Sequence, residues 1–410
     1  MIHKYRELFL VPGAAAFSLA AFVGRLPVAM LGLGVVLLVS TVSGSYTAAG
    51  TVAAATMVGY AVAAPVVGRT VDRHGQRRVL LALAALHFAG LVALMAAAEY
   101  GAPLPVLCAA GALAGLSRPS TGTMVRTRWA HVLQRGDGRA GEAKVQTAFS
   151  FEAIVDEVAF ISGPVIVTAL ATGVHHLAGI AACLVMTVGG ATAMALQKNT
   201  EPPARGAPGE RGSALVVPGM AVIAVAMLFA GAIVGALELA VVAKTEAFGS
   251  QGATGPLLAV LAVGSMLGGL WYGARSWELP PDRLWIRCLA AQAVALGLLP
   301  LAGGMWSLAA AMFVVGLTVA PVGIAGVVLM ERLLPSRVLT EGISIETTAM
   351  ATGVAVGGWA AGVVTEELGS GRALALPAVC ALAALGAAVL GARRLAVENS
   401  SEPDAPSRTE

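Results

Sequence analysis

Twelve apolar runs, separated by short polar segments, narrow the folds open to this chain more than any other feature. A helix needs about 20 apolar residues to cross a bilayer, because the hydrocarbon core is about 30 Å thick. With 57% hydrophobic and only 12% charged residues, the chain has too little polar surface for a water-soluble globule. We therefore predict an all-α polytopic membrane protein with twelve transmembrane helices. The runs lie near residues 11–42, 47–68, 78–98, 104–127, 144–171, 176–197, 216–242, 252–274, 284–301, 305–331, 338–365 and 372–394.

A polar stretch rich in proline and glycine, residues 198–213, divides the runs into two sets of six. This composition is typical of a linker. The predicted units are an N-terminal six-helix bundle at 1–198, a cytoplasmic linker at 199–215, a C-terminal six-helix bundle at 216–394 and a disordered tail at 395–410.

Short matches relate the two sets of runs. Val-Pro-Gly opens the first and seventh runs, at residues 11–13 and 217–219. Ser-Phe-Glu at 150–152 is echoed by Ser-Ile-Glu at 344–346, and Gly163-Pro164 by two glycines at the same offset. These matches indicate a six-plus-six duplication, which gives two pseudo-symmetric bundles.

The basic residues indicate how the chain lies in the membrane. When the N-terminus is placed in the cytoplasm, nearly all of the 26 Lys and Arg residues fall on the cytoplasmic side. The exceptions are Lys244 and Arg372 on the other side, and Arg25 and Arg118 inside runs. Because cytoplasmic loops carry the excess of Lys and Arg, we predict a multi-pass protein of the cytoplasmic (inner) membrane with both termini cytoplasmic.

The segment between the second and third runs is short and basic, reading Gly68-Arg69-Thr70-Val71-Asp72-Arg73-His74-Gly75-Gln76-Arg77-Arg78. Its residues predict a tight cytoplasmic hairpin in which Asp72 caps a helix start or pairs with a guanidinium. The segment resembles the loop between the second and third helices of major facilitator superfamily permeases. The resemblance implies that a salt bridge of Asp72 breaks when the cavity opens inward. A generic basic loop is the alternative. The implied gating motif consists of Gly68, Asp72, Arg73, Gly75, Arg77 and Arg78.

Ionisable residues inside the runs are the default functional candidates, because a charge in hydrocarbon costs several kcal/mol unless it is paired or wet. By helix rise, Arg118 and Glu152 lie at about the same depth, about 12–13 Å from the cytoplasmic edge, and Asp156 lies about 18 Å from it. We predict that Arg118 and Glu152 face each other. Either Glu152 and Asp156 load and release a proton beside Arg118, or Arg118 and Glu152 form a fixed structural pair.

Two further patterns resemble the superfamily. Arg118 followed four residues later by Gly122 resembles its fourth-helix pattern, which implies a role in proton coupling. Gly163-Pro164 partly resembles the antiporter pattern of its fifth helix, which hints at export; a plain helix kink is the alternative.

The remaining candidates lie in the first and eleventh runs and in the loop after the fourth. We predict that Arg25, next to Leu26-Pro27, binds an anionic substrate group or pairs with Glu238. Glu346 is predicted to line the opposite wall of the cavity. The basic loop cluster is predicted to touch anionic lipid head groups, with Trp129 as an interface anchor. That cluster consists of Arg126, Arg128, His131, Arg135, Arg139 and Lys144.

These observations predict a secondary active transporter that moves a small molecule by alternating access. The resemblance is closest to bacterial drug and metabolite efflux permeases, and we expect proton-coupled export of an amphipathic molecule. The alternatives are an importer of a sugar or organic acid, and a non-transporting membrane receptor with the same fold. The expected partners are the substrate, protons and membrane lipids, with a monomeric chain. We expect no enzymatic activity, cofactor, metal or nucleic acid.

Overall fold

The computed structural model describes residues 7–133, 138–204, 217, 219–334 and 336–395. Every regular element in these ranges is a helix. The predicted tail beyond residue 395, most of the predicted linker (205–215) and Arg135 lie outside the described residues. The side chain of Arg139 also lies outside them.

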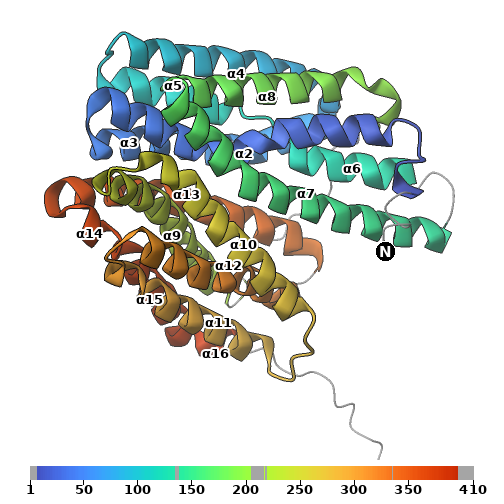
Figure 1. Ribbon diagram of the computed structural model, residues 1–410. Helices are drawn as coiled ribbons and strands as arrows, with labels where there is room; N and C mark the ends of the chain where they lie inside the picture. Colours follow the sequence, from blue (N-terminus) through green and yellow to red (C-terminus); the bar gives the residue numbers. More distant parts are fainter. Residues whose placement is uncertain (1–6, 134–137, 205–216, 218, 335, 396–410) are drawn as a thin grey trace, which may run out of the picture.

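Figure 1 shows two groups of helices that lie side by side near α3 and α13 and diverge toward the opposite end. The first group, which we call the N-terminal bundle, comprises α2 Ala14–Ser43, α3 Tyr46–His74, α4 Gln76–Glu99, α5 Leu104–Leu116, α6 Thr121–Leu133, α7 Gly138–Gly173 and α8 Ala178–Leu196. A short 3-10 helix, η1 Lys198–Thr200, follows it.

The second group, which we call the C-terminal bundle, begins at Gly219. It comprises α9 Met220–Ala247, η3 Gln251–Ala253, α10 Thr254–Gly273, α11 Pro281–Leu296, η4 Leu299–Leu301, α12 Met305–Leu333, α13 Ser336–Leu368, α14 Ser370–Ala373, α15 Leu376–Leu390 and α16 Ala392–Leu395.

Eleven helices within the described ranges are long and apolar enough to cross a membrane. The prediction of a single fourth helix over residues 104–127 is wrong. This crossing is divided into α5 and α6, each 13 residues long, by a non-helical break at 118–120. Pro119 explains the break, because proline lacks a backbone N–H and pushes the preceding residue out of the helical region.

The duplication seen in the sequence is present in the backbone. Gly13 precedes α2 and Gly219 precedes α9, and both adopt left-handed conformations, with φ of 83° and 98°. This region of φ/ψ space favours glycine because it has no Cβ. The two bundles therefore begin in the same way, as expected of pseudo-symmetric repeats.

The C-terminal bundle is built around an unusually close contact between α9 and α13. A Cβ added at Gly231 would lie 2.0 Å from the Met350 carbonyl oxygen, and one at Gly357 would lie 2.1 Å from that of Ala232. Gly235 and Gly353 make equivalent contacts. Small residues spaced four apart allow two helix backbones to come into contact. In a bilayer such close packing is a main source of helix association, because the surrounding lipid is as apolar as the side chains.

Candidate functional site

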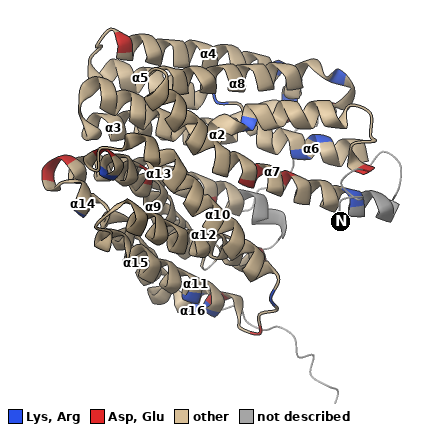
Figure 2. Cartoon of the chain, in the orientation of Figure 1, with Lys and Arg blue, Asp and Glu red and all other residues tan. Residues whose placement is uncertain are grey.

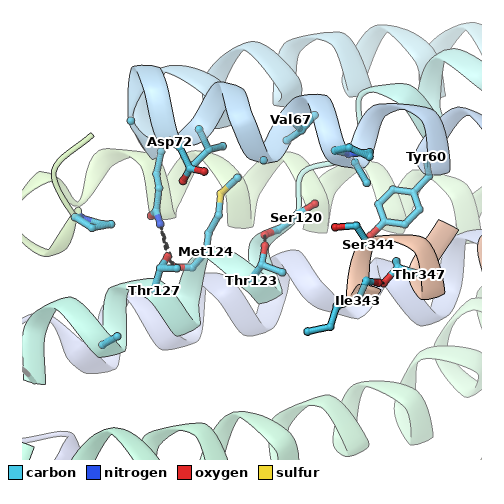
Figure 3. Close-up of a pocket in the computed structure, with 18 of the residues that line it drawn as sticks. Tyr60, Val67, Asp72, Ser120, Thr123, Met124, Thr127, Ile343, Ser344 and Thr347 are labelled. Atoms are coloured by element: carbon cyan, nitrogen blue, oxygen red, sulfur yellow. Dashed lines mark hydrogen bonds between the residues drawn. The ribbon is translucent and has the colours of Figure 1, made fainter. Parts of the chain in front are cut away.

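A cavity of about 620 Å³ lies between the two bundles. Its walls come from α3, α6 and α13, with the start of α4 and the segment after η1 at its rim. Figure 3 shows Tyr60 of α3 across from Ser344 and Thr347 of α13. The lining is mostly apolar with hydroxyl groups, and among the described residues that line it the one carboxylate is that of Asp72. The hydroxyl-bearing residues are Tyr60, Ser120, Thr123, Thr127, Ser344, Thr347 and Thr348.

The cavity extends toward one end of the molecule, which we call the basic end and define by the α3–α4 junction at Gly75. The exposed side chain of Asp72 and the residues Pro202 and Pro203 line the cavity there. In Figure 2 several of the Lys and Arg positions, coloured blue, lie at this end of the N-terminal bundle, around α6 and the end of α8. The opposite end, defined by the α2–α3 junction at Gly44, is called the far end.

At the far end the bundles are in direct contact. A Cβ at Gly50 of α3 would lie 2.5 Å from the Gly358 carbonyl oxygen of α13, and one at Gly362 would lie 2.4 Å from that of Tyr46. A Cβ at Gly255 of α10 would lie 2.5 Å from the Pro164 carbonyl oxygen of α7. Backbone contacts of this kind leave no room for a passage between these helix pairs.

Hydrogen bonds between the bundles add to this closure. The Glu366 carboxylate accepts from the Thr47 backbone N–H at 3.0 Å and from the hydroxyls of Ser45 and Thr47, both at 2.5 Å. The Tyr46 hydroxyl donates to Glu246 of α9. The molecule is therefore open at the basic end and closed at the far end.

Beside the cavity, α2, α6 and α7 are joined by a chain of alternating charges. Arg25 donates to Glu152 and, at 2.7 Å, to the Oδ1 of Asp156. Arg126 donates to the Oδ2 of Asp156, also at 2.7 Å. Arg25 and Glu152 are buried, with 4% and 0% of their side chains exposed. The two positive and two negative charges balance, which is the arrangement that a membrane interior tolerates.

Trp129 completes this chain and corrects a prediction. It is fully buried, its Nε1 donates to the Oε1 of Glu152 at 2.6 Å, and its ring contacts that of Phe17 edge-to-face with centroids 4.7 Å apart. It is therefore not an interface anchor. The fourth crossing continues as α6 to Leu133, so residues predicted to lie in a loop face the protein interior instead.

The predicted pairing of Arg118 with Glu152 is wrong. The break at 118–120 turns Arg118 toward α3, where its guanidinium carbon lies 3.6 Å from the centroid of the Tyr60 ring. Such cation–π contacts contribute about 0.5–2 kcal/mol. The predicted pairing of Arg25 with Glu238 is also wrong, because Arg25 binds the two carboxylates of α7.

The gating motif differs from its prediction in part. The tight hairpin is present and is shorter than expected, since α3 runs to His74, α4 begins at Gln76, and only Gly75, at φ 82°, lies between the two helices. Gly68 is helical, and Asp72 lies in the last turn of α3 rather than at a helix start. Asp72 makes no ion pair with any described residue. Arg73 and Arg78 are exposed, and the backbone N–H of Arg77 donates to Glu201 at 2.8 Å.

A buried arginine that the sequence analysis assigned to the lipid surface ties this junction together. Arg128 is 0% exposed and donates to the Gln76 side chain at 2.8 Å, the Thr200 hydroxyl at 3.0 Å and the Gln197 carbonyl at 3.1 Å. The Gln76 amide donates in turn to the Thr127 hydroxyl at 2.7 Å, as the dashed line in Figure 3 shows. Only contacts between residues far apart in the sequence reveal this role.

Glu346 lies on α13. It is partly buried and forms no hydrogen bond or ion pair with the part of the chain that the structure describes. It does not line the cavity, although its neighbours Ile343, Ser344 and Thr347 do.

Comparisons with known proteins agree with this architecture. Residues 17–275 match the family model described as Major Facilitator Superfamily. No curated protein matches the sequence significantly. A bacterial homologue of the iron transporter ferroportin, in an inward-facing state, is 14% identical, with 91% of this chain and 97% of that chain covered and a TM-score of 0.69.

Two further solved structures are similar over nearly their full length. The nucleoside transporter NupG, in a mutant form, is 15% identical, with 92% of this chain and 99% of that chain covered and a TM-score of 0.72. The POT family transporter PepTSo is 10% identical, with 93% and 97% covered and a TM-score of 0.71. At these identities the likeness concerns the fold alone.

Proposed function

Because the chain belongs to the Major Facilitator Superfamily, we propose that it is a secondary transporter that exports an amphipathic small molecule in exchange for protons. The observation that carries this proposal is the one-sided cavity. It lies between two pseudo-symmetric bundles, reaches the basic end and is sealed at the far end by backbone contacts. Alternating access requires one state that is open only at the basic end and a second that is open only at the far end. The two states interconvert when one bundle rocks against the other.

The lining of the cavity supports an amphipathic cargo. Apolar side chains such as Val67, Met124 and Ile343 alternate with hydroxyls, and no Lys or Arg is among the residues that line it. A mostly apolar wall with a few polar groups suits ligands that are themselves partly apolar. The fold does not name the cargo, since the similar structures include carriers named for iron and for nucleosides.

The distribution of Lys and Arg supports an orientation with the basic end in the cytoplasm of the inner membrane. In that orientation the structure is the inward-open state. Arg118, Glu152, Asp156, Glu346 and Arg25 remain candidates for coupling. In this state Glu152 is held by Arg25, and Asp156 is held by Arg25 and Arg126, so a coupling role for these carboxylates would require those contacts to break.

The test is transport by the full chain in proteoliposomes that contain a pH-sensitive dye. We expect at least one member of a panel of amphipathic amines, acids, nucleosides and sugars to move against its gradient when a pH gradient is imposed, with protons moving the opposite way. Uptake that is unchanged by the pH gradient would show a facilitator instead. Movement of substrate and protons in the same direction would show an importer.

The cavity state is tested separately by cross-linking. In a background with Cys108, Cys183, Cys288 and Cys380 replaced, a short bifunctional thiol reagent should join cysteines at positions 45 and 366 in the absence of substrate. Substrate that drives outward opening should lower this yield. An unchanged yield during active transport would contradict a far-end gate at this position.

A further inference from the structure

Glu238 is a carboxylate of α9 that faces α2 across the interface between the bundles. A Cβ at Gly32 of α2 would lie 3.4 Å from both of its carboxylate oxygens. Glu238 is partly buried, and within the described residues it forms neither a hydrogen bond nor an ion pair. Around it, α2 and α9 share one buried apolar cluster that includes Leu31, Val35 and Leu239.

Charged groups on the helices around α9 are directed elsewhere. Arg25, two turns earlier on α2, is held by Glu152 and Asp156. On α9 itself, Lys244 lies over the Phe248 ring and Glu246 accepts from Tyr46 of α3. The other titratable or charged groups nearest this level are Glu346, Glu366 and Glu367 on α13, Arg372 on α14 and Cys380 on α15. On α10 and α12 they are Tyr272, Glu331 and Arg332, all in basic-end turns.

The depth of Glu238 places it beyond the cavity. It lies nine residues, or about 14 Å, before the far end of α9. The residues that line the cavity belong to neither α2 nor α9. With the far end closed, this side chain therefore has no counter-ion among the described residues and does not line the cavity, and a membrane interior strongly disfavours an unpaired carboxylate.

We propose that Glu238 is a proton-binding site whose occupancy is coupled to the far-end gate. When α2 and α9 close over it, the carboxylate takes up one proton from far-end water and is buried as the neutral acid. When the far end opens, water reaches the side chain and the proton is released there. This inference rests on the proposed alternating access and makes its far-end gate depend on pH. Because the proton enters and leaves on the same side, the site regulates the gate and carries no proton across the membrane.

The experiment measures the gate directly and needs no substrate. Spin labels are placed on cysteines at the exposed far-end positions Thr41 of α2 and Leu368 of α13, in the full chain without its native cysteines, and distances are recorded by pulsed electron paramagnetic resonance. One proton taken up on closing makes the ratio of closed to open molecules fall up to about tenfold per pH unit as the pH rises. Glu238→Gln should stay closed at every pH. The matched control is Glu367→Gln, an exposed far-end acid, which should behave like the parent.

Two further variants keep the test decisive if Glu238→Gln folds poorly. Glu238→Asp retains an acid and should retain the pH response. Gly32→Ala places a methyl in ordinary contact with the carboxylate and excludes water, so the pH response should move to higher pH. A pH response that survives Glu238→Gln, an unresponsive parent or an unmoved response in Gly32→Ala would each overturn the proposal.

Replacing Na⁺ by K⁺ separates the proton from a metal cation. A gate that follows Na⁺ at constant pH and ignores pH would show that the site takes a cation, which also overturns the proposal. Failure here leaves transport by alternating access untouched, whereas failure to find a transported compound leaves the gate measurement valid.

Discussion

The two bundles begin alike and share one fold, yet they hold their corresponding helices together by opposite means. Counting from Gly13 and Gly219, Arg25 corresponds to Gly231; counting from Glu152 and Glu346, Asp156 corresponds to Met350. Arg25 binds Asp156 through a partly buried ion pair, whereas the backbone of Gly231 lies directly against the carbonyl oxygen of Met350.

This difference shows that duplication preserved the path of the backbone without preserving the chemistry of the interfaces. The α2–α7 interface depends on several charges together. Removing one of them leaves its partner buried without a counter-ion, which destabilises the folded protein. The α9–α13 interface depends on the absence of side chains. The placement of ionisable groups therefore differs between the bundles: Arg25 and Asp156 are paired, whereas Glu346 and Glu238 form no ion pair with any residue that the structure describes.

The largest effect is expected from breaking the ionic interface. Arg25→Met leaves Glu152 buried without its counter-ion and should lower the free energy of unfolding by about 3–5 kcal/mol. The double variant with Glu152→Gln should recover most of this loss, since Asp156 keeps Arg126. Unfolding in detergent measures both. Arg118→Met, which loses only the contact with Tyr60, is the control; an equal loss in the two single variants would contradict the ionic interface.

The glycine interface gives the next effect. In Gly357→Ala the new Cβ would lie 2.1 Å from a carbonyl oxygen of α9, and we expect a loss of about 3 kcal/mol, as is found for overpacked interiors. The adjacent Gly358→Ala places its Cβ no closer than 3.7 Å to any atom and should be nearly neutral. The same unfolding measurement compares them. Equal stability of the two variants would show that α9 and α13 do not pack as described.

The smallest effect concerns how corresponding helices begin. The N-terminus of α4 has no cap of its own and is capped by Glu201, whereas α11 begins with Pro281, which has no N–H to satisfy. Glu201→Ala should cost about 1 kcal/mol. Hydrogen exchange should rise in the first turn of α4 and remain unchanged in the first turn of α11. A uniform rise in both would argue against a local cap.

The membrane class, the twelve crossings and the twofold repeat are all readable in the sequence, because each depends on residues close together in the chain. The pairing of charges is not readable, because it depends on where helices begin. The sequence analysis started the fifth helix near residue 144, but α7 begins at Gly138. Depths counted from an assumed helix end therefore do not show which charges lie at the same level.

The fourth crossing shows a second limit of sequence analysis. Pro119 signals a break, but composition still gives one apolar run, so Arg118 was placed on a continuous helix. Once the helix is broken, Arg118 faces Tyr60, and the start of α6 brings Trp129 and Arg126 to the carboxylates of α7. Similarly, Glu201 caps a helix 124 residues away in the chain, and no periodicity encodes such a contact.

Residues 198–204 pack onto the N-terminal bundle, and this shortens the part of the chain that connects the two bundles. Thr200 is held by Arg128, Glu201 by the start of α4, and Pro202 and Pro203 form part of the cavity rim. Fully extended, these seven residues would span about 25 Å, and this length is held against the N-terminal bundle. A chain divided into two fragments would therefore keep these contacts in its N-terminal part only if the cut fell after residue 204.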